Sequence, residues 1–205
     1  MNKKKAFLIG ITGTFGAGKS TVGEILVKNG VFVIDADHIV SQILQTPNKI
    51  SNKVVKTFGK EIINKRFRGF YINKSKLAKI VFSSTIKKGL LENVIHPEVQ
   101  KRLRLIIKSK KQKKQIIAIL APLLFEANME KMFDDIWCVV CSNKVRVSRL
   151  NRKGYNSLEI KQRTKSQLPQ NIKASKVDFI IDNSSLFTRT RKQVLRRLQF
   201  LRSRL

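Results

Sequence analysis

The stretch GTFGAGKST, residues 13–21, decides the fold, because it fits the pattern G-x-x-x-x-G-K-[ST] at Gly13, Gly18, Lys19 and Ser20. The apolar run AFLIGIT at 6–12 precedes it and predicts a short buried strand. VGEILVKNG at 22–30 follows, and its apolar residues recur at helical spacing until Gly30. The order strand, glycine-rich loop, helix is that of a phosphate-binding loop.

Such a loop binds phosphate because its backbone N–H groups converge at the positive end of a helix. We expect Lys19 to reach the β- and γ-phosphates of ATP, and the hydroxyl of Ser20 to bind Mg²⁺. The alternative is a chance glycine-rich turn before an amphipathic helix, but the strand and helix patterns on either side favour a nucleotide site. The candidate nucleotide-binding residues are Gly13, Gly16, Ala17, Gly18, Lys19, Ser20 and Thr21.

The length of 205 residues suits a single α/β domain, 1–205. Residues 41–112 carry only helix-like patterns and no strong strand, which predicts a helical cap over the ligand edge of a sheet core built from 1–40 and 113–205. The expected fold is therefore a P-loop NTPase-like parallel five-stranded sheet with flanking helices and a substrate-binding cap. Its strands are predicted from five runs that are apolar throughout, at 6–12, 31–36, 115–121, 135–141 and 178–182.

The chain is strongly basic, with 43 Lys and Arg against 13 Asp and Glu and a net charge of +30. Such a charge attracts polyanions, so nucleic-acid binding is an alternative. The spread of the clusters indicates compositional drift over an ordinary enzyme, and we expect no specific nucleic-acid partner. The clusters are NKKK at 2–5, KSKKQKK at 108–114, KVRVSRLNRK at 144–153 and RTRKQVLRRLQFLRSRL at 189–205.

The two cysteines, Cys138 and Cys141, have the C-x-x-C spacing of redox and zinc sites. On a strand, residues three apart point to opposite faces, so we expect two separate buried thiols in a reducing compartment. No apolar run approaches the ~20 residues of a membrane span, and the N-terminus lacks a cleavage-like site. A cytoplasmic protein is expected.

A second motif, VIDADHIV at 33–40, places Asp35 and Asp37 where the second strand ends. A carboxylate there could accept a proton from a substrate hydroxyl or orient Mg²⁺. The alternative is that either Asp caps a helix beginning at His38.

Further motifs follow: HPEVQ at 96–100, APLLFEAN at 121–128, RLNRKGYNSLEIKQRTKSQLP at 149–169 and DFIIDNSS at 178–185. In this order, together with the phosphate loop and DADHI, they resemble the dephospho-CoA kinase family over nearly the whole chain, from Ile9 to about Ser185. The resemblance implies transfer of the γ-phosphoryl group of ATP to the ribose 3′-hydroxyl of dephospho-CoA, with Mg²⁺. It also implies a lid at 146–168 that closes over ATP.

The resemblance assigns roles to single residues. Asp37 would be the general base, while Lys19 and the lid arginines Arg149 and Arg152, with Arg163 behind them, would stabilise charge on the phosphates. Each arginine has the alternative of a solvated surface position, His96 that of a structural residue, and the apolar residues that of core packing. The candidate substrate-binding residues are Asp35, His96, Leu123, Phe125 and Glu126.

The sequence departs from the family pattern in the lid, where RLNRKG is one residue shorter than expected, so which arginine faces ATP stays open. Asn73 and Lys74 follow Ile72 where relatives tend to have an Asp and an Arg. Another small P-loop kinase is the main alternative. We expect no membrane association, and a monomer or small homo-oligomer.

Overall fold

The computed structural model describes residues 6–67, 69–110 and 115–205. The chain forms two compact units, Met1–Asp35 with Lys110–Leu205 and Ala36–Ser109. We call them the phosphate-loop unit and the inserted unit. The basic cluster at 2–5 and most of that at 108–114 lie outside the described residues.

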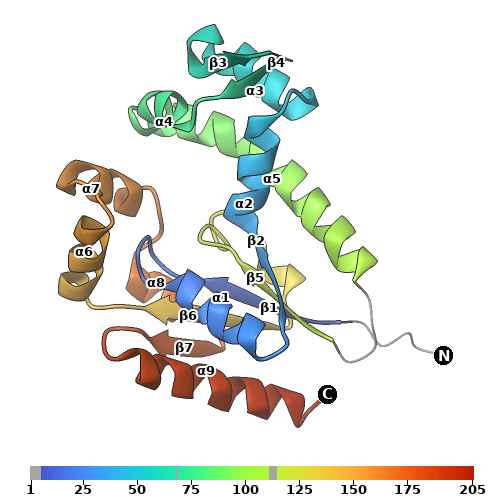
Figure 1. The fold of residues 1–205 in the computed structure, drawn as a ribbon, viewed down its shortest axis with the longest axis vertical. Helices are drawn as coiled ribbons and strands as arrows, with labels where there is room; N and C mark the ends of the chain where they lie inside the picture. Colours follow the sequence, from blue (N-terminus) through green and yellow to red (C-terminus); the bar gives the residue numbers. More distant parts are fainter. Residues whose placement is uncertain (1–5, 68, 111–114) are drawn as a thin grey trace. The chain divides into compact units, whose positions relative to one another are not determined.

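The phosphate-loop unit is built on a five-stranded sheet with the order β2-β5-β1-β6-β7 (Figure 1). All neighbouring strands are parallel. Their carboxyl ends therefore meet at one edge, where ligands bind in such sheets. The five strands expected from the apolar runs are confirmed as β1 (Phe7–Thr12), β2 (Phe32–Asp35), β5 (Ile116–Leu120), β6 (Asp135–Val140) and β7 (Phe179–Asp182).

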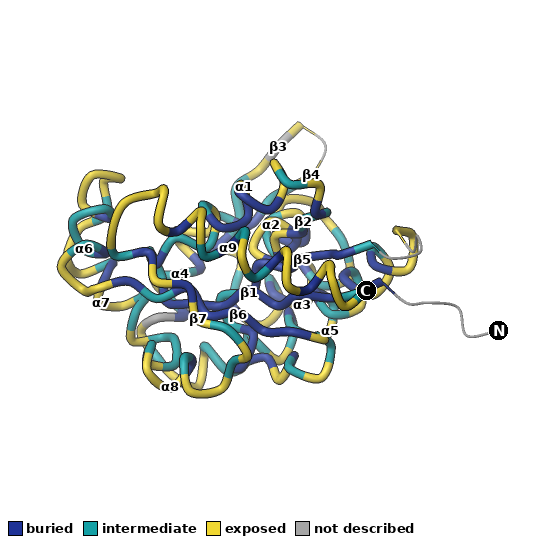
Figure 2. Tube along the Cα trace, turned by 90° about the horizontal axis from the view of Figure 1, so that it is seen from below, coloured by how far each residue is buried: buried dark blue, intermediate teal, exposed yellow. Residues whose placement is uncertain are grey.

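Helices α1 (Lys19–Lys28) and α9 (Phe187–Arg202) contact each other and bury apolar side chains against the sheet. Figure 2 shows β1, β5 and β6 as buried chain. The remaining elements of the unit are η2 (Glu130–Met132), α6 (Asn143–Arg152), α7 (Ser157–Lys165) and α8 (Gln170–Ala174). The core includes Ile9, Ile11, Val22, Ile25, Leu26, Trp137, Val139, Ile181, Val194 and Leu198.

The inserted unit is built around α5 (Thr85–Ser109), whose buried residues Ile95, Val99, Leu103 and Ile107 recur every four positions. Helices α2 (Ala36–Gln45), α3 (Lys49–Phe58) and α4 (Lys74–Phe82) all contact α5. The short helix η1 is Lys60–Ile62.

Two expectations about this unit are wrong. It contains an antiparallel hairpin of β3 (Ile63–Arg66) and β4 (Gly69–Ile72) where only helices were expected. Each strand has four residues, too few for a clear alternating pattern. Helix α2 begins at Ala36 rather than His38, so Asp37 lies within its first turn.

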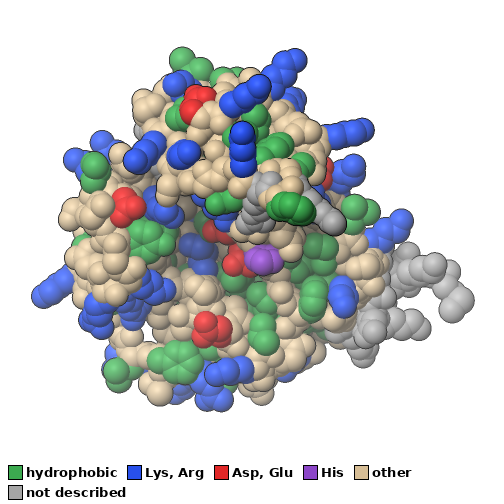
Figure 3. Space-filling view, turned by 45° about the horizontal axis from the view of Figure 1, so that its top comes forward, with side chains coloured by type: hydrophobic (Ala, Val, Ile, Leu, Met, Phe, Trp, Pro, Cys, Tyr) green, Lys and Arg blue, Asp and Glu red, His purple; other side chains and the backbone are tan. Residues whose placement is uncertain are grey.

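Both cysteines are free and buried, as expected. Burial raises the pKa of Cys138 to about 11, and burial also raises the pKa of Cys141. Among the described residues, no helix is long and apolar enough to cross a membrane. Figure 3 shows Lys and Arg side chains scattered over the visible face, with few acidic ones between them.

Candidate active site

The glycines of the phosphate loop adopt backbone conformations that other residues rarely take. Gly16 and Gly18 have φ of 80° and 106°. A Cβ atom on Gly18 would lie 1.9 Å from Nδ2 of Asn183, and one on Gly13 would lie 2.4 Å from the carbonyl oxygen of Val139. Glycine is therefore required for both the turn and its close packing against β6 and the chain after β7.

The loop separates its backbone N–H groups into two sets. The N–H of Phe15 donates to Oε1 of Gln167 at 2.7 Å, and that of Ala17 donates to the carbonyl of Thr14 at 3.1 Å. The second set has no acceptor within 6–67, 69–110 and 115–205, and its members lie in the loop and in the first turn of α1, the end of a helix that favours negative charge. These N–H groups belong to Gly16, Gly18, Ser20 and Thr21.

Lys19 lies over the loop that it is expected to serve. Its Nζ donates to the carbonyl oxygens of Gly13 and Thr14 at 2.7 and 3.0 Å. These contacts hold the ammonium group beside the N–H groups that would receive phosphate, so phosphate oxygens can replace the carbonyls as acceptors without a large movement.

The hydroxyl of Ser20 is exposed in the first turn of α1. Mg²⁺ in nucleotide sites takes one or two protein oxygens together with phosphate oxygens, so a single exposed hydroxyl beside the loop fits this ion. No group of three or more His, Cys, Asp or Glu side chains gathers as a metal site within the described part of the chain.

Asn183, just after β7, forms a hydrogen bond to the phosphate loop. Its Nδ2 donates to the carbonyl of Ala17 at 2.8 Å, and its Oδ1 accepts from the hydroxyl of Thr190 at 2.9 Å. Nη1 of Arg149 donates to the Asn183 carbonyl at 2.7 Å. Because Asn183 contacts the loop directly, Arg149 is connected to the loop through this one residue. Arg152 is exposed and donates instead to Ser148 on its own helix at 3.3 Å.

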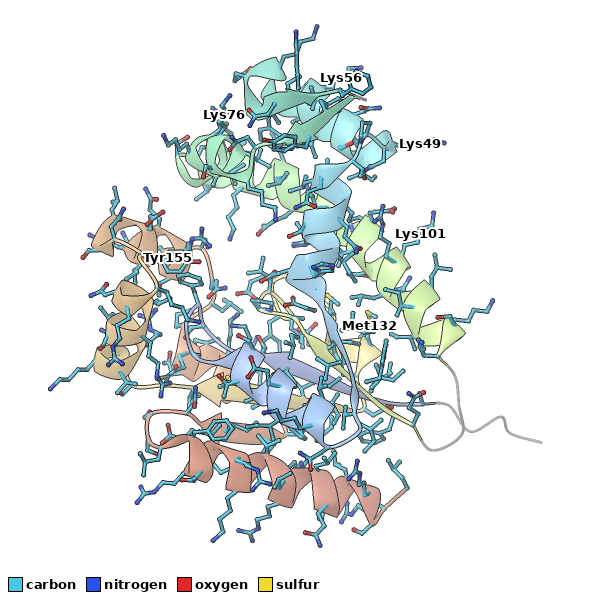
Figure 4. All side chains as sticks on the ribbon, in the orientation of Figure 1. Lys49, Lys56, Lys76, Lys101, Met132 and Tyr155 are labelled. Atoms are coloured by element: carbon cyan, nitrogen blue, oxygen red, sulfur yellow. The ribbon has the colours of Figure 1, made fainter. Side chains whose placement is uncertain are left out.

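Two further arginines hold the apex of the loop. Buried Arg146 donates through Nη1 to the carbonyl of Phe15 at 3.2 Å and to the hydroxyl of Thr164 at 3.0 Å, and burial lowers its pKa. The Arg163 guanidinium lies 5.0 Å from the ring centre of Phe15 and 5.1 Å from that of Tyr155. Tyr155 lies between α6 and α7 (Figure 4). Helices α6 and α7 are thus fastened to the phosphate loop.

The residues expected to bind substrate after β5 have different environments. Phe125 is buried, Leu123 is half-buried, and Glu126 forms an ion pair with Nζ of fully buried Lys173 at 2.9 Å. Asp35, the last residue of β2, is exposed and lies opposite Leu120 in the sheet register, at the ligand edge.

The family model for dephospho-CoA kinase matches residues 7–188. This chain belongs to the dephospho-CoA kinase family. It is 39% identical over 194 residues to dephospho-CoA kinase of Carboxydothermus hydrogenoformans, covering 94% of this chain and 93% of that protein. It is 35% identical to that of Streptococcus mutans, covering 94% and 98%.

Solved structures agree. Dephospho-CoA kinase from Campylobacter jejuni superposes with a TM-score of 0.67 at 26% identity, covering 96% of this chain and 97% of that one. A Thermus thermophilus protein of known structure superposes with a TM-score of 0.80 at 25% identity, covering 97% of this chain and 98% of that one. Shikimate kinase from Acinetobacter baumannii superposes with a TM-score of 0.52 at 15% identity, covering 98% of this chain and 96% of that one. This likeness shows a shared fold alone. The expected P-loop NTPase-like fold of a kinase is confirmed.

Two residues expected in the site of this family member, Asp37 and His96, belong to the inserted unit. Asp37 is exposed in the first turn of α2, where a carboxylate is favoured by the helix dipole. His96 is half-buried within α5 and precedes Pro97, which has no N–H to donate back along the helix.

Sequence reasoning missed several residues that surround the loop. Arg146 and Lys173 look like solvated basic residues in the sequence, yet they are 8% and 0% exposed. Neither has a local pattern that announces burial, because their partners come from distant parts of the chain. Gln167 lies within the QLP segment that carried the family resemblance, so that segment was the available signal.

Proposed function

We propose that this chain transfers the γ-phosphoryl group of ATP to the ribose 3′-hydroxyl of dephospho-CoA, giving CoA and ADP, the last step of coenzyme A synthesis. Membership of the dephospho-CoA kinase family supports this reaction. The observation that carries it is the set of four N–H groups, in the phosphate loop and the first turn of α1, that have no acceptor among the described residues.

The phosphate loop and Lys19 would bind the β- and γ-phosphates. Phosphoryl transfer depends mainly on positioning and charge stabilisation, and fixed N–H groups supply both without reorganising. Mg²⁺, which Ser20 would hold, neutralises charge on the phosphates when bound. The transfer is in line and direct, with no phosphoenzyme.

On the acceptor side, Asp37 would take the proton of the ribose hydroxyl, and Asp35 would orient the Asp37 carboxylate. Both assignments rest on the DADHI motif and on the exposure of both carboxylates. His96 and the inserted unit, as a cap, would bind dephospho-CoA together with Leu123 and Phe125. Glu126 was expected to join them, but its ion pair with Lys173 supports a different role.

Among the lid arginines of residues 146–168, Arg149 is the better candidate for contact with ATP. It donates to the Asn183 carbonyl beside the loop, whereas Arg152 donates to Ser148 of its own helix. Arg149 would stabilise charge that develops during transfer, and Arg152 would join it when the lid closes over ATP.

The test is ADP release by the purified protein with Mg²⁺ and ATP, using dephospho-CoA and then adenosine as acceptor. We expect turnover with dephospho-CoA only, and a loss of at least about 10³-fold in Lys19→Ala and Asp37→Asn, since each removes a central group. Turnover with adenosine alone, or an unaffected Asp37→Asn enzyme, would contradict the proposal.

We further propose that the high charge serves no specific nucleic-acid partner, that the protein does not associate with membranes, and that it acts in the cytoplasm as a monomer or small homo-oligomer. Any binding to DNA should then fall steeply between ~50 and ~200 mM salt without sequence preference. Sequence-selective binding that persists at the higher salt would contradict this.

A further inference from the structure

A set of connected contacts links the residue before the phosphate loop to a residue within it. Just before the loop, the hydroxyl of Thr12 donates to the carbonyl of Pro122 at 3.3 Å. Nζ of Lys173 donates to the same carbonyl. The residue before the loop and a buried lysine of α8 thus share one acceptor at the end of β5.

Lys173 connects this acceptor to Glu126. Its ammonium group is fully buried and lies 2.9 Å from Oε1 of Glu126, whose own side chain is 11% exposed. A lysine is seldom buried unless its charge is paired and its N–H groups have acceptors, and here the carboxylate and the Pro122 carbonyl meet both needs.

Glu126 in turn holds the backbone of the segment that contacts the loop. Its Oε1 accepts from the N–H of Leu168 at 2.7 Å. The preceding residue, Gln167, accepts from the N–H of Phe15 through Oε1, also at 2.7 Å. The carboxylate therefore holds the backbone beside Gln167, and Gln167 holds the N–H of Phe15, the residue before Gly16, whose own N–H has no acceptor among the described residues.

We propose that Gln167 is a positioning residue for the phosphates of ATP, and that the Glu126–Lys173 ion pair supports it through Leu168. Gln167 occupies the N–H of Phe15 and thereby sets the direction of the next peptide groups toward the nucleotide. Glu126 acts through this connection and makes no contact with dephospho-CoA. The inference rests on the proposed function.

The test compares Gln167→Met, which keeps the length of the side chain but removes the acceptor, with Gln162→Met as a matched control. Gln162 is exposed on α7 in the same segment. Direct calorimetric binding of MgADP is measured beside the KM values for ATP and for dephospho-CoA.

In Gln167→Met, we expect the Kd of MgADP and the KM of ATP to rise about tenfold, because a hydrogen bond that orients the loop is lost. The KM of dephospho-CoA should stay within about twofold, and Gln162→Met should match the wild type. Glu126→Gln should shift the ATP values in the same direction, again with dephospho-CoA unchanged.

Several results would overturn the inference. A rise in the KM of dephospho-CoA in Glu126→Gln would assign Glu126 to the acceptor, and a lower thermal stability of Gln167→Met with unchanged MgADP binding would make the contact purely structural. Because MgADP binding needs no acceptor substrate, this outcome is separate from failure of the proposed reaction, which would leave the wild type inactive with dephospho-CoA.

Discussion

The phosphate-loop unit and the inserted unit use polar side chains differently. In the first, buried polar residues include Thr12, Asp135, Arg146, Lys173 and Asn183, and its ion pairs join segments far apart in sequence, as in Lys173 with Glu126. In the inserted unit, Ser51 is the one buried polar residue among the described side chains. The ion pairs described there are both between positions i and i+4 of α5.

This difference indicates two kinds of rigidity. Buried charge pairs are costly to break because the partner left behind is desolvated and alone, whereas exposed i,i+4 pairs contribute little. The phosphate-loop unit is thus held by buried pairs between distant segments, while the inserted unit is held mainly by the apolar face of α5 and presents charged residues such as Lys49, Lys56 and Lys101 to solvent (Figure 4).

The largest effect of breaking this arrangement is expected at Gly18. In Gly18→Ala, the new Cβ would lie 1.9 Å from Nδ2 of Asn183 and the residue would keep a φ of 106°, so the loop must shift. We expect turnover to fall about 10³-fold as the N–H groups lose their aim at the phosphates. Steady-state kinetics measures it, and activity within a factor of ten of the wild type would show that the loop tolerates the shift.

A smaller effect is expected from comparing the two kinds of ion pair. Lys173→Met leaves the largely buried Glu126 carboxylate, 11% exposed, without its cation, so we expect the free energy of unfolding to fall by about 3–5 kcal/mol. Arg102→Met removes a half-buried partner of Glu98 from α5, where water still reaches the pair, and should cost no more than about 0.5 kcal/mol.

Urea denaturation measures both variants. The single tryptophan, Trp137, is fully buried in β6 and its fluorescence reports on the phosphate-loop unit, while far-UV circular dichroism follows the helices. Equal losses in the two variants would remove the distinction between the units.

The sequence was sufficient to predict those features that depend on neighbours along the chain. The five strands follow from apolar runs such as those at 6–12 and 135–141, and the phosphate loop follows from the spacing of its glycines and Lys19. The DADHI and PLLFE motifs supported the family, which the comparisons confirm.

Features that depend on distant partners could not be predicted in this way. The carboxylate that pairs with Lys173 lies 47 residues away, and the N–H held by Gln167 lies 152 residues away. The spacing of residues around Lys173 and around Gln167 says nothing about either contact. The hairpin β3–β4 was missed for a local reason, because its strands are short and the first carries Asn64 and Lys65.

The smallest expected effect has the opposite sign and belongs to the inserted unit. Gly89 lies within α5, and a Cβ atom there would meet no atom within 4 Å. Gly89→Ala should therefore stabilise α5 by about 0.5–1 kcal/mol, because alanine loses less backbone entropy on forming a helix. Slower hydrogen exchange of the α5 amides, with unchanged turnover, would check it. Faster exchange would mean that this position needs glycine as Gly18 does, and that the inserted unit is packed as tightly there as the phosphate loop.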